Sequence, residues 1–208
     1  MKAVKINLYS DTQSQPTPAM REAMASAEVG DEQHRLDPSV SKLCHEVTEL
    51  LGKEDALFLP SGTMCNQISL AVHCGAGDEI IADESAHIIN YEAGGPAVLS
   101  RSLVRALDGD CGIFDAEDVQ KAIRSNSYHA PRSRLVVVEQ TSNRGGGAVW
   151  PLSTLQGVAT VAREHGLNLH MDGARLMNAV VASGVPAAEF AATVDSLWLD
   201  LSKGLGCP

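Results

Sequence analysis

The chain has 208 residues and a formal net charge of −10, with 16 basic and 26 acidic side chains. Hydrophobic residues make up 44% and charged residues 20%, a balance that excludes a disordered or low-complexity protein and predicts a compact fold. Binding to nucleic acid would require a local basic patch against this acidic background, and the sequence contains no such patch.

Membrane and secretory signals are missing from the sequence. The apolar runs are far shorter than the roughly 20 residues that cross a bilayer, and the N-terminus is too polar for a signal peptide. The five cysteines have irregular spacing, which indicates neither a disulfide framework nor a zinc site. We expect a cytoplasmic protein with reduced thiols, no bound metal, and no membrane or nucleic-acid partner.

Helical and strand-like segments alternate along the chain. A first helix can begin at Thr17 or Pro18, and a second can be capped by Ser39 and stop at Gly52. Further helices are expected through Ile68, Leu70 and Val72, and over residues 115–123 and 153–165. Short apolar runs predict strands at residues 56–60, 79–82, 135–139, 167–171 and 196–199. The polar residues 124–134 are expected to form a loop.

Strands that are apolar on both faces need helices on both sides of a sheet. We therefore expect an α/β fold with a mostly parallel sheet and helices on both faces. Since no repeat, charge block or linker divides the chain, the expected organisation is an N-terminal arm over residues 1–16 and a large domain over residues 17–208.

Three local features lie where such a fold builds its sites. Ser61, Gly62 and Thr63 stand where a predicted strand meets a helix, and free N–H groups there favour a phosphate. Asp172 directly follows one predicted strand, and Lys203 follows another among glycines that let a ligand approach the backbone. Taken singly, each feature is more typical of a helix cap, a turn or a solvated side chain.

Taken together, the three features supply what pyridoxal phosphate needs. A helix start can hold the phosphate, a carboxylate can keep the pyridine nitrogen protonated, and a lysine amine can form an imine with the aldehyde. The combination therefore predicts pyridoxal 5'-phosphate as the cofactor.

Five motifs carry a resemblance to a known family. In this order and spacing, SDT, PSGTMCNQ, ADESAHI, HMDGAR and LSKGLG resemble those of low-specificity threonine aldolases, which are fold-type I pyridoxal-phosphate enzymes of the β-eliminating-lyase superfamily. The resemblance covers nearly all of the chain. It implies the large domain of that fold, and the retro-aldol cleavage of threonine, allo-threonine and similar β-hydroxy-α-amino acids to glycine and an aldehyde.

The resemblance also assigns residues to the cofactor. Lys203 would be the Schiff-base lysine, and Asp172 would pair with the pyridine nitrogen. Ser61, Gly62 and Thr63 would hold the phosphate.

Other positions match family residues that meet the cofactor ring or the substrate. His87 would stack on the ring and is the candidate base for the β-hydroxyl proton, directly or through a water, with His129 as second candidate. Arg175 would contact the phenolic oxygen or the substrate carboxylate, and Ser10 would help to hold that carboxylate. His34 stands where family members commonly have a tyrosine, so the substrate preference at that wall is open.

Family members continue beyond the residue that matches Lys203, with the rest of the large domain and a small C-terminal domain. We therefore expect a large domain that is truncated just after the Schiff-base lysine. The complete enzyme is expected to be a homo-oligomer, a dimer or tetramer, with an amino acid as substrate. Two alternatives stay open: another pyridoxal-phosphate-dependent β-eliminating lyase, and a non-catalytic fragment that acts as a binding module.

Overall fold

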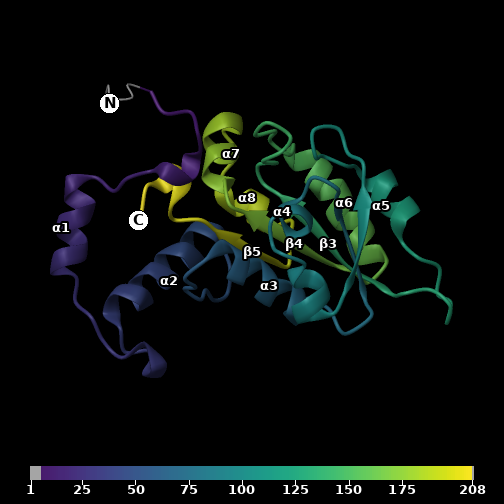
Figure 1. Cartoon of the computed structure of the whole chain (residues 1–208), viewed down its shortest axis with the longest axis horizontal. Helices are drawn as coiled ribbons and strands as arrows, with labels where there is room; N and C mark the ends of the chain where they lie inside the picture. Colours follow the sequence, from purple (N-terminus) through teal and green to yellow (C-terminus); the bar gives the residue numbers. More distant parts are fainter. Residues whose placement is uncertain (1–5, 208) are drawn as a thin grey trace.

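The computed structural model describes residues 6–207 as an α/β fold around a five-stranded sheet (Figure 1). The strands are β1 (Glu79–Asp83), β2 (Leu103–Leu107), β3 (Ser133–Glu139), β4 (Asn168–Gly173) and β5 (Ser196–Leu199). Their order is β2-β1-β3-β4-β5, and all neighbours are parallel. The prediction of a parallel α/β sheet is confirmed; residues 1–5 of the predicted arm and Pro208 lie outside the described residues.

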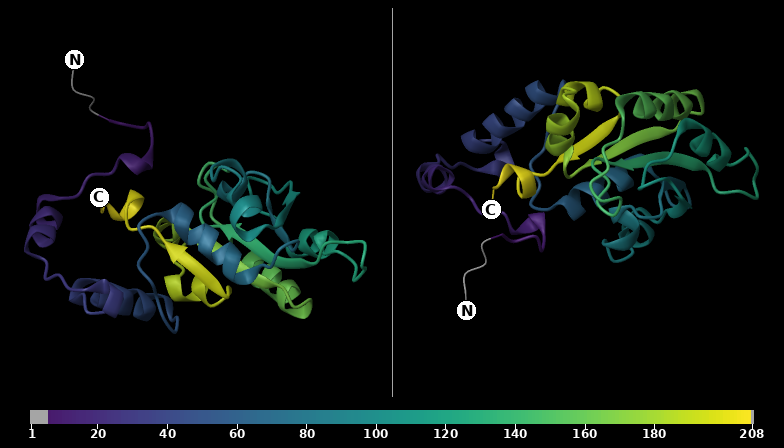
Figure 2. Two further views of the ribbon diagram at one scale, coloured as in Figure 1. Left: turned by 60° about the horizontal axis from the view of Figure 1, so that its bottom comes forward. Right: turned by 90° about the horizontal axis from the view of Figure 1, so that it is seen from above.

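Helices pack on both faces of the sheet, as expected (Figure 2). The helices are α1 (Pro18–Ser26), α2 (Pro38–Leu51), α3 (Gly62–His73), α4 (His87–Asn90), α5 (Ala116–Ala122), α6 (Leu152–Glu164), α7 (Leu176–Ser183) and α8 (Ala187–Ala191). One face carries α3 and α4, and the other carries α5, α6 and α8. Within residues 6–207, no helix is long and apolar enough to cross a bilayer.

Two hydrophobic cores hold the sheet between these helix layers. Side chains along a strand alternate between its faces, so Ile80 and Val137 pack with Leu70 of α3. Their neighbours Ile81 and Val136 belong to the larger core on the other face. Both faces of the sheet are therefore covered by apolar side chains.

The second helix begins differently from the prediction. Asp37, not Ser39, is the N-cap, and its Oδ1 accepts from the N–H of the third helical residue at 3.0 Å. Pro38 occupies the first helical position, where the missing N–H has no cost. Ser39 is already helical, and its Oγ donates to the Glu28 carbonyl at 2.6 Å. The predicted stop at Gly52 is confirmed, with φ at 64°.

Residues 56–60 form no strand, which corrects the prediction. A strand needs a hydrogen-bonded neighbour, and within residues 6–207 this segment has none. It instead lines one wall of a largely apolar cleft of about 670 Å³, whose other wall includes β5. Leu57 is 66% exposed and Phe58 49% exposed. An apolar run predicts burial, but the run alone does not reveal whether a pairing partner lies beside it.

Four of the strands and α-helices are not apparent in the hydrophobic pattern. β2 is an edge strand with Arg105 at its centre, so it lacks the continuous apolar run of the inner strands. The other three are the helices α4, α7 and α8, which have four, eight and five residues and are too short for a clear helical period.

The larger core provides a direct test of the packing. Phe190 of α8 is fully buried there, so Phe190→Ala should lower the free energy of unfolding by roughly 3–5 kcal/mol. Val181 of α7 is 84% exposed, and Val181→Ala should change the free energy by less than about 0.5 kcal/mol. Urea unfolding followed by far-UV circular dichroism measures both values, and equal losses in the two variants would contradict this packing.

Candidate active site

Parallel strands bring their carboxyl ends to one edge of the sheet, and acidic residues gather there. Asp83 and Glu139 end β1 and β3, Asp172 lies near the end of β4, and Asp200 directly follows β5. From β1 the chain goes to β2 on one side and then to β3 on the other, which creates a crevice between β1 and β3. His87 lies at this crevice, where its backbone N–H donates to Glu139 Oε2 at 2.8 Å.

A cavity of about 160 Å³ lies at this edge, and predicted site residues line much of its wall. The predicted residues in its lining are Gly62, Thr63, His87, Asp172, Arg175 and Lys203. They come from α3, α4, β4, the start of α7 and the short 3-10 helix η4 (Lys203–Leu205), segments far apart in the sequence. The structure thus brings the helix start, the acid and the amine around one cavity, which opens beside the larger cleft.

Asp172 is the most deeply buried acid in the lining of this cavity. Its Oδ2 accepts from Asn66 Nδ2 at 2.8 Å and its Oδ1 from the Ala174 N–H at 3.1 Å. Burial, reinforced by the nearby Glu139, raises the pKa of Asp172 to about 6. A cation in the cavity would favour the charged form of this carboxylate and offset the cost of its burial.

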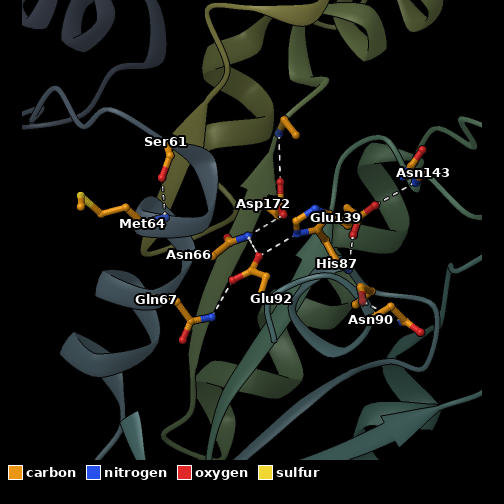
Figure 3. A network of polar contacts seen from close by, with 12 residues as sticks. Ser61, Met64, Asn66, Gln67, His87, Asn90, Glu92, Glu139, Asn143 and Asp172 are labelled. Atoms are coloured by element: carbon orange, nitrogen blue, oxygen red, sulfur yellow. Dashed lines mark hydrogen bonds and ion pairs between the residues drawn. The ribbon is translucent and has the colours of Figure 1, made fainter. Parts of the chain in front are cut away.

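His87 faces the cavity from α4, and its ring is held from behind (Figure 3). Its Nδ1 lies 2.7 Å from Glu92 Oε1, and its ring centroid lies 5.3 Å from that of Tyr91. The hydrogen bond with Glu92 raises the pKa of His87 above its ordinary value, although burial acts in the opposite direction. The imidazole is therefore fixed in place and supported as a cation.

The start of α3 has the features of a phosphate cradle. Ser61 caps the helix, and its Oγ accepts from the Met64 N–H at 3.2 Å. Within residues 6–207 the N–H groups of Gly62 and Thr63 have no hydrogen-bond partner, and they stand at the positive end of a 12-residue helix. A Cβ on Gly62 would overlap with the Trp198 ring, so this position requires glycine.

Two basic side chains complete the lining, each beside a carboxylate. Lys203 Nζ lies 3.0 Å from Asp200 Oδ2 and 5.8 Å from the Trp198 ring centroid. Arg175 makes two bonds to Asp11 of the SDT motif, from Nε at 2.5 Å and from Nη2 at 2.9 Å. This pair lowers the pKa of Asp11 and raises that of Arg175. The N-terminal arm is thereby tied to the cavity wall.

The structure does not bring His129 to the cavity. It lies in the loop before β3, at the amino end of that strand, whereas the cavity lies at the carboxyl ends. Its ring is exposed and packs on Tyr128, with 4.0 Å between the centroids. The family resemblance suggested its place along the chain but could not show to which edge of the sheet its loop belongs.

Ser10 and His34 also lie outside the cavity lining. Ser10 caps the 3-10 helix η1 (Asp11–Gln13), its Oγ accepting from the Thr12 N–H at 3.2 Å, and η1 packs against η4. Ser10 is therefore near the Lys203 segment. His34 ends the 3-10 helix η2 (Glu32–His34) between α1 and α2, is exposed, and pairs with Asp31 at 3.8 Å.

Sequence reasoning missed several residues that shape the site. Asn66 contacts Asp172, Glu92 contacts His87, and Glu139 holds the start of α4. Glu139 ends a predicted strand, so the rule that singled out Asp172 could have found it. Asn66 stands within the PSGTMCNQ motif, but nothing in the sequence links it or Glu92 to the acid.

His87, Glu92 and Asp172 place possible ligand atoms within 4.8 Å of one another. These groups are joined by hydrogen bonds, because Asn66 Nδ2 donates to both carboxylates and His87 Nδ1 lies against Glu92. Hydrogen bonds therefore join these three residues and Asn66 into one network.

Several known proteins with similar sequences are threonine aldolases. The chain is 42% identical over 207 residues to low-specificity L-threonine aldolase 1 of Arabidopsis thaliana, covering 98% of this chain and 58% of that protein. It is also 42% identical over 204 residues to the low specificity L-threonine aldolase of Escherichia coli K12, covering 98% of this chain and 60% of that protein. The chain thus spans less than two thirds of the length of these relatives.

Solved structures show the same fold. A threonine aldolase of Leishmania major superposes with a TM-score of 0.81 at 24% identity, over 91% of this chain and 56% of that one. The sequence pattern that defines the beta-eliminating lyase family matches residues 7–208. Because this match covers nearly the whole chain and includes every residue of the cavity lining, the chain belongs to the beta-eliminating lyase family.

Proposed function

We propose that this chain forms the cofactor-binding part of a pyridoxal-phosphate-dependent aldehyde-lyase of the threonine aldolase type. The substrates would be L-threonine, allo-threonine and similar β-hydroxy-α-amino acids, and the products glycine and an aldehyde. The observation that supports this most strongly is the single cavity that gathers Lys203, Asp172 and the start of α3. The 42% identity to low-specificity threonine aldolases supports the choice of substrate class.

The residues around the cavity fit pyridoxal phosphate. The open N–H groups of Gly62 and Thr63 suit a phosphate, and the Lys203 amine reaches the same cavity. The buried carboxylate of Asp172 has a raised pKa and accepts hydrogen bonds from neutral donors, so a protonated ring nitrogen would complete its environment. When bound, the cofactor would act as an electron sink for the bond that breaks at the amino acid.

The protein side chains would divide the remaining tasks. Asp172 would keep the ring nitrogen protonated, and Arg175, held by Asp11, would orient the phenolic oxygen or the substrate carboxylate. With Nδ1 held by Glu92, His87 has Nε2 left to take a proton at the substrate hydroxyl, directly or through a water.

Three predicted site residues lie outside the cavity lining. Ser10 lies on η1 against η4 and is proposed to help hold the substrate carboxylate. His34 and His129 lie away from the cavity, so this proposal gives them no part in proton transfer or substrate contact.

We further propose a cytoplasmic homo-oligomer, a dimer or a tetramer. All five cysteines are free, as expected in a reducing compartment. Large apolar side chains such as Val98 and Leu99 are well exposed, and a subunit interface would cover them. Light scattering after size exclusion would give the mass of a dimer or tetramer, and an active monomer would contradict the oligomer.

The family match also supports a second candidate, a pyridoxal-phosphate lyase that eliminates a β-substituent. The same cavity residues would serve both reactions. Release of glycine and aldehyde from threonine indicates the aldolase, whereas pyruvate and ammonia from serine or cysteine indicate the eliminating lyase. A chain that binds pyridoxal phosphate and releases neither set of products would be a binding module.

Covalent trapping tests the proposed lysine. Borohydride reduction of the chain with pyridoxal phosphate should fix the cofactor on Lys203, because its amine lines the cavity. Lys203→Ala should abolish this fixation and threonine cleavage, as detected by mass spectrometry of peptides and by glycine release. Lys42→Ala removes an exposed amine on α2 and serves as control. Equal fixation in the Lys203→Ala variant would overturn the assignment.

The stability of the cofactor-free chain should depend on Asp172. Its pKa is about 6 when folded and 3.8 ordinarily, so the folded state binds the proton more tightly and stability falls as pH rises from about 4 to 6. The full loss corresponds to roughly 3 kcal/mol. Asp172→Asn should remove this contribution from the pH dependence of urea unfolding. Asp108→Asn, at an exposed acid, should retain the wild-type pH dependence, and an unchanged dependence in Asp172→Asn would contradict the assigned cause.

A further inference from the structure

Glu92 is a buried acid behind His87, and the function proposed above uses it only as the partner of His87 Nδ1. It follows α4, and its side chain is fully inaccessible to solvent. Taking a carboxylate out of water is costly unless its oxygens receive hydrogen bonds. The contacts of this side chain therefore indicate what compensates for its burial.

Each partner of the Glu92 carboxylate can act as a donor (Figure 3). Oε1 accepts from Asn66 Nδ2 at 2.7 Å and lies 2.7 Å from His87 Nδ1, while Oε2 accepts from Gln67 Nε2 at 2.5 Å. Two amide donors and an imidazole around one carboxyl group form the environment of an ionised acid. His87 then carries a proton on Nδ1, and its neutral form has Nε2 as the acceptor.

Asn66 extends this arrangement to Asp172. Its single amide nitrogen donates both to Glu92 Oε1 and to Asp172 Oδ2, at 2.7 and 2.8 Å. Its Oδ1 accepts from Trp198 Nε1 at 2.9 Å, and the residue is completely buried, so the amide cannot turn away. One fixed amide therefore sets the spacing between the acid behind His87 and the acid at the ring-nitrogen position.

We propose that Glu92 is a positioning residue that fixes the orientation and Nδ1–H tautomer of His87 and, through Asn66, holds His87 and Asp172 in one frame. The catalytic part of this inference rests on the proposed function. The tautomer and the proton affinity of His87 do not, because they are properties of the cofactor-free chain.

Several charged groups face His87, and the effect of Glu92 on the imidazole has to be distinguished from theirs. Glu139 of β3 and Asp172 of β4 raise the pKa of His87 less than the hydrogen bond with Glu92 does. The remaining charged residues of the cavity lining are Arg175, Asp200 and Lys203. Arg175 is paired with Asp11, and Lys203 is paired with Asp200. The carboxylate in direct contact with the His87 imidazole is that of Glu92.

Nitrogen-15 NMR of the histidine-labelled, cofactor-free chain tests the inference without any substitution at Glu92. The His87 resonances are those lost in His87→Asn. Above its pKa, His87 should show a protonated Nδ1 and an unprotonated Nε2. An Nε2–H tautomer in the wild-type chain would overturn the proposal.

The variant Glu92→Gln then measures the role of the charge. The introduced amide has nearly the same shape, and the Oε1 of Gln67, which has no partner among residues 6–207, can turn to accept from it. The pKa of His87 should fall by about one unit or more. Glu92→Asp keeps the charge and should give an intermediate value. Glu84→Gln makes the same chemical change at an exposed residue and should leave the His87 titration unaltered. An unchanged titration in Glu92→Gln would reject the positioning role.

The pH profile of threonine cleavage is a further test, because a purely structural role of Glu92 would not shift that profile. If His87 is the base, the acidic limb of the kcat profile for threonine cleavage should move to lower pH in Glu92→Gln, and kcat should fall more than KM rises. The chain could show the Nδ1–H tautomer, and a lower His87 pKa in Glu92→Gln, yet release no glycine from threonine. That result would reject the proposed function and leave the positioning role of Glu92 intact. An unaltered kcat limb in an active Glu92→Gln enzyme would reject its catalytic part.

Discussion

The buried carboxylate of Asp172 is the constraint on which the site depends. The fold places this acid at the end of an inner strand, where burial and Glu139 raise its pKa to about 6. Its hydrogen bonds come from neutral donors, so at neutral pH the free cavity holds an incompletely compensated negative charge. If pyridoxal phosphate binds as proposed, Asp172 would pair with its protonated ring nitrogen, which would offset the cost of burying the carboxylate and would keep the ring able to accept electrons.

The rest of the fold keeps this carboxylate and its partners in register. Hydrophobic cores on both faces fix the strands, and parallel pairing aligns their carboxyl ends beside the start of α3. Asn66 on α3 holds Asp172 on one side and Glu92 on the other, so helix, strand and loop share one set of hydrogen bonds. The cavity is therefore built where these elements meet, and the N-terminal arm contacts its wall through the ion pair between Asp11 and Arg175.

The sequence predicted the parts of the site that depend on local position. Lys203, Asp172 and Gly62 each stand at a strand end or a helix start, and parallel strands bring such positions to one edge. The sequence could not predict contacts that depend on side-chain geometry, such as those of Glu92. The residues next to Glu92 in the chain do not reveal which distant side chains it contacts. The predicted strand at residues 56–60 shows the same limit, since hydrophobicity does not specify a pairing partner.

The protonation state of the bound cofactor tests this account most directly. Pyridoxal phosphate labelled with nitrogen-15 in its ring, once bound to the chain, reports by its chemical shift whether that nitrogen carries a proton. A salt bridge with Asp172 predicts that the protonated shift persists at pH 7 and above. An unprotonated ring nitrogen at pH 7 in the bound cofactor would contradict the central role given to Asp172.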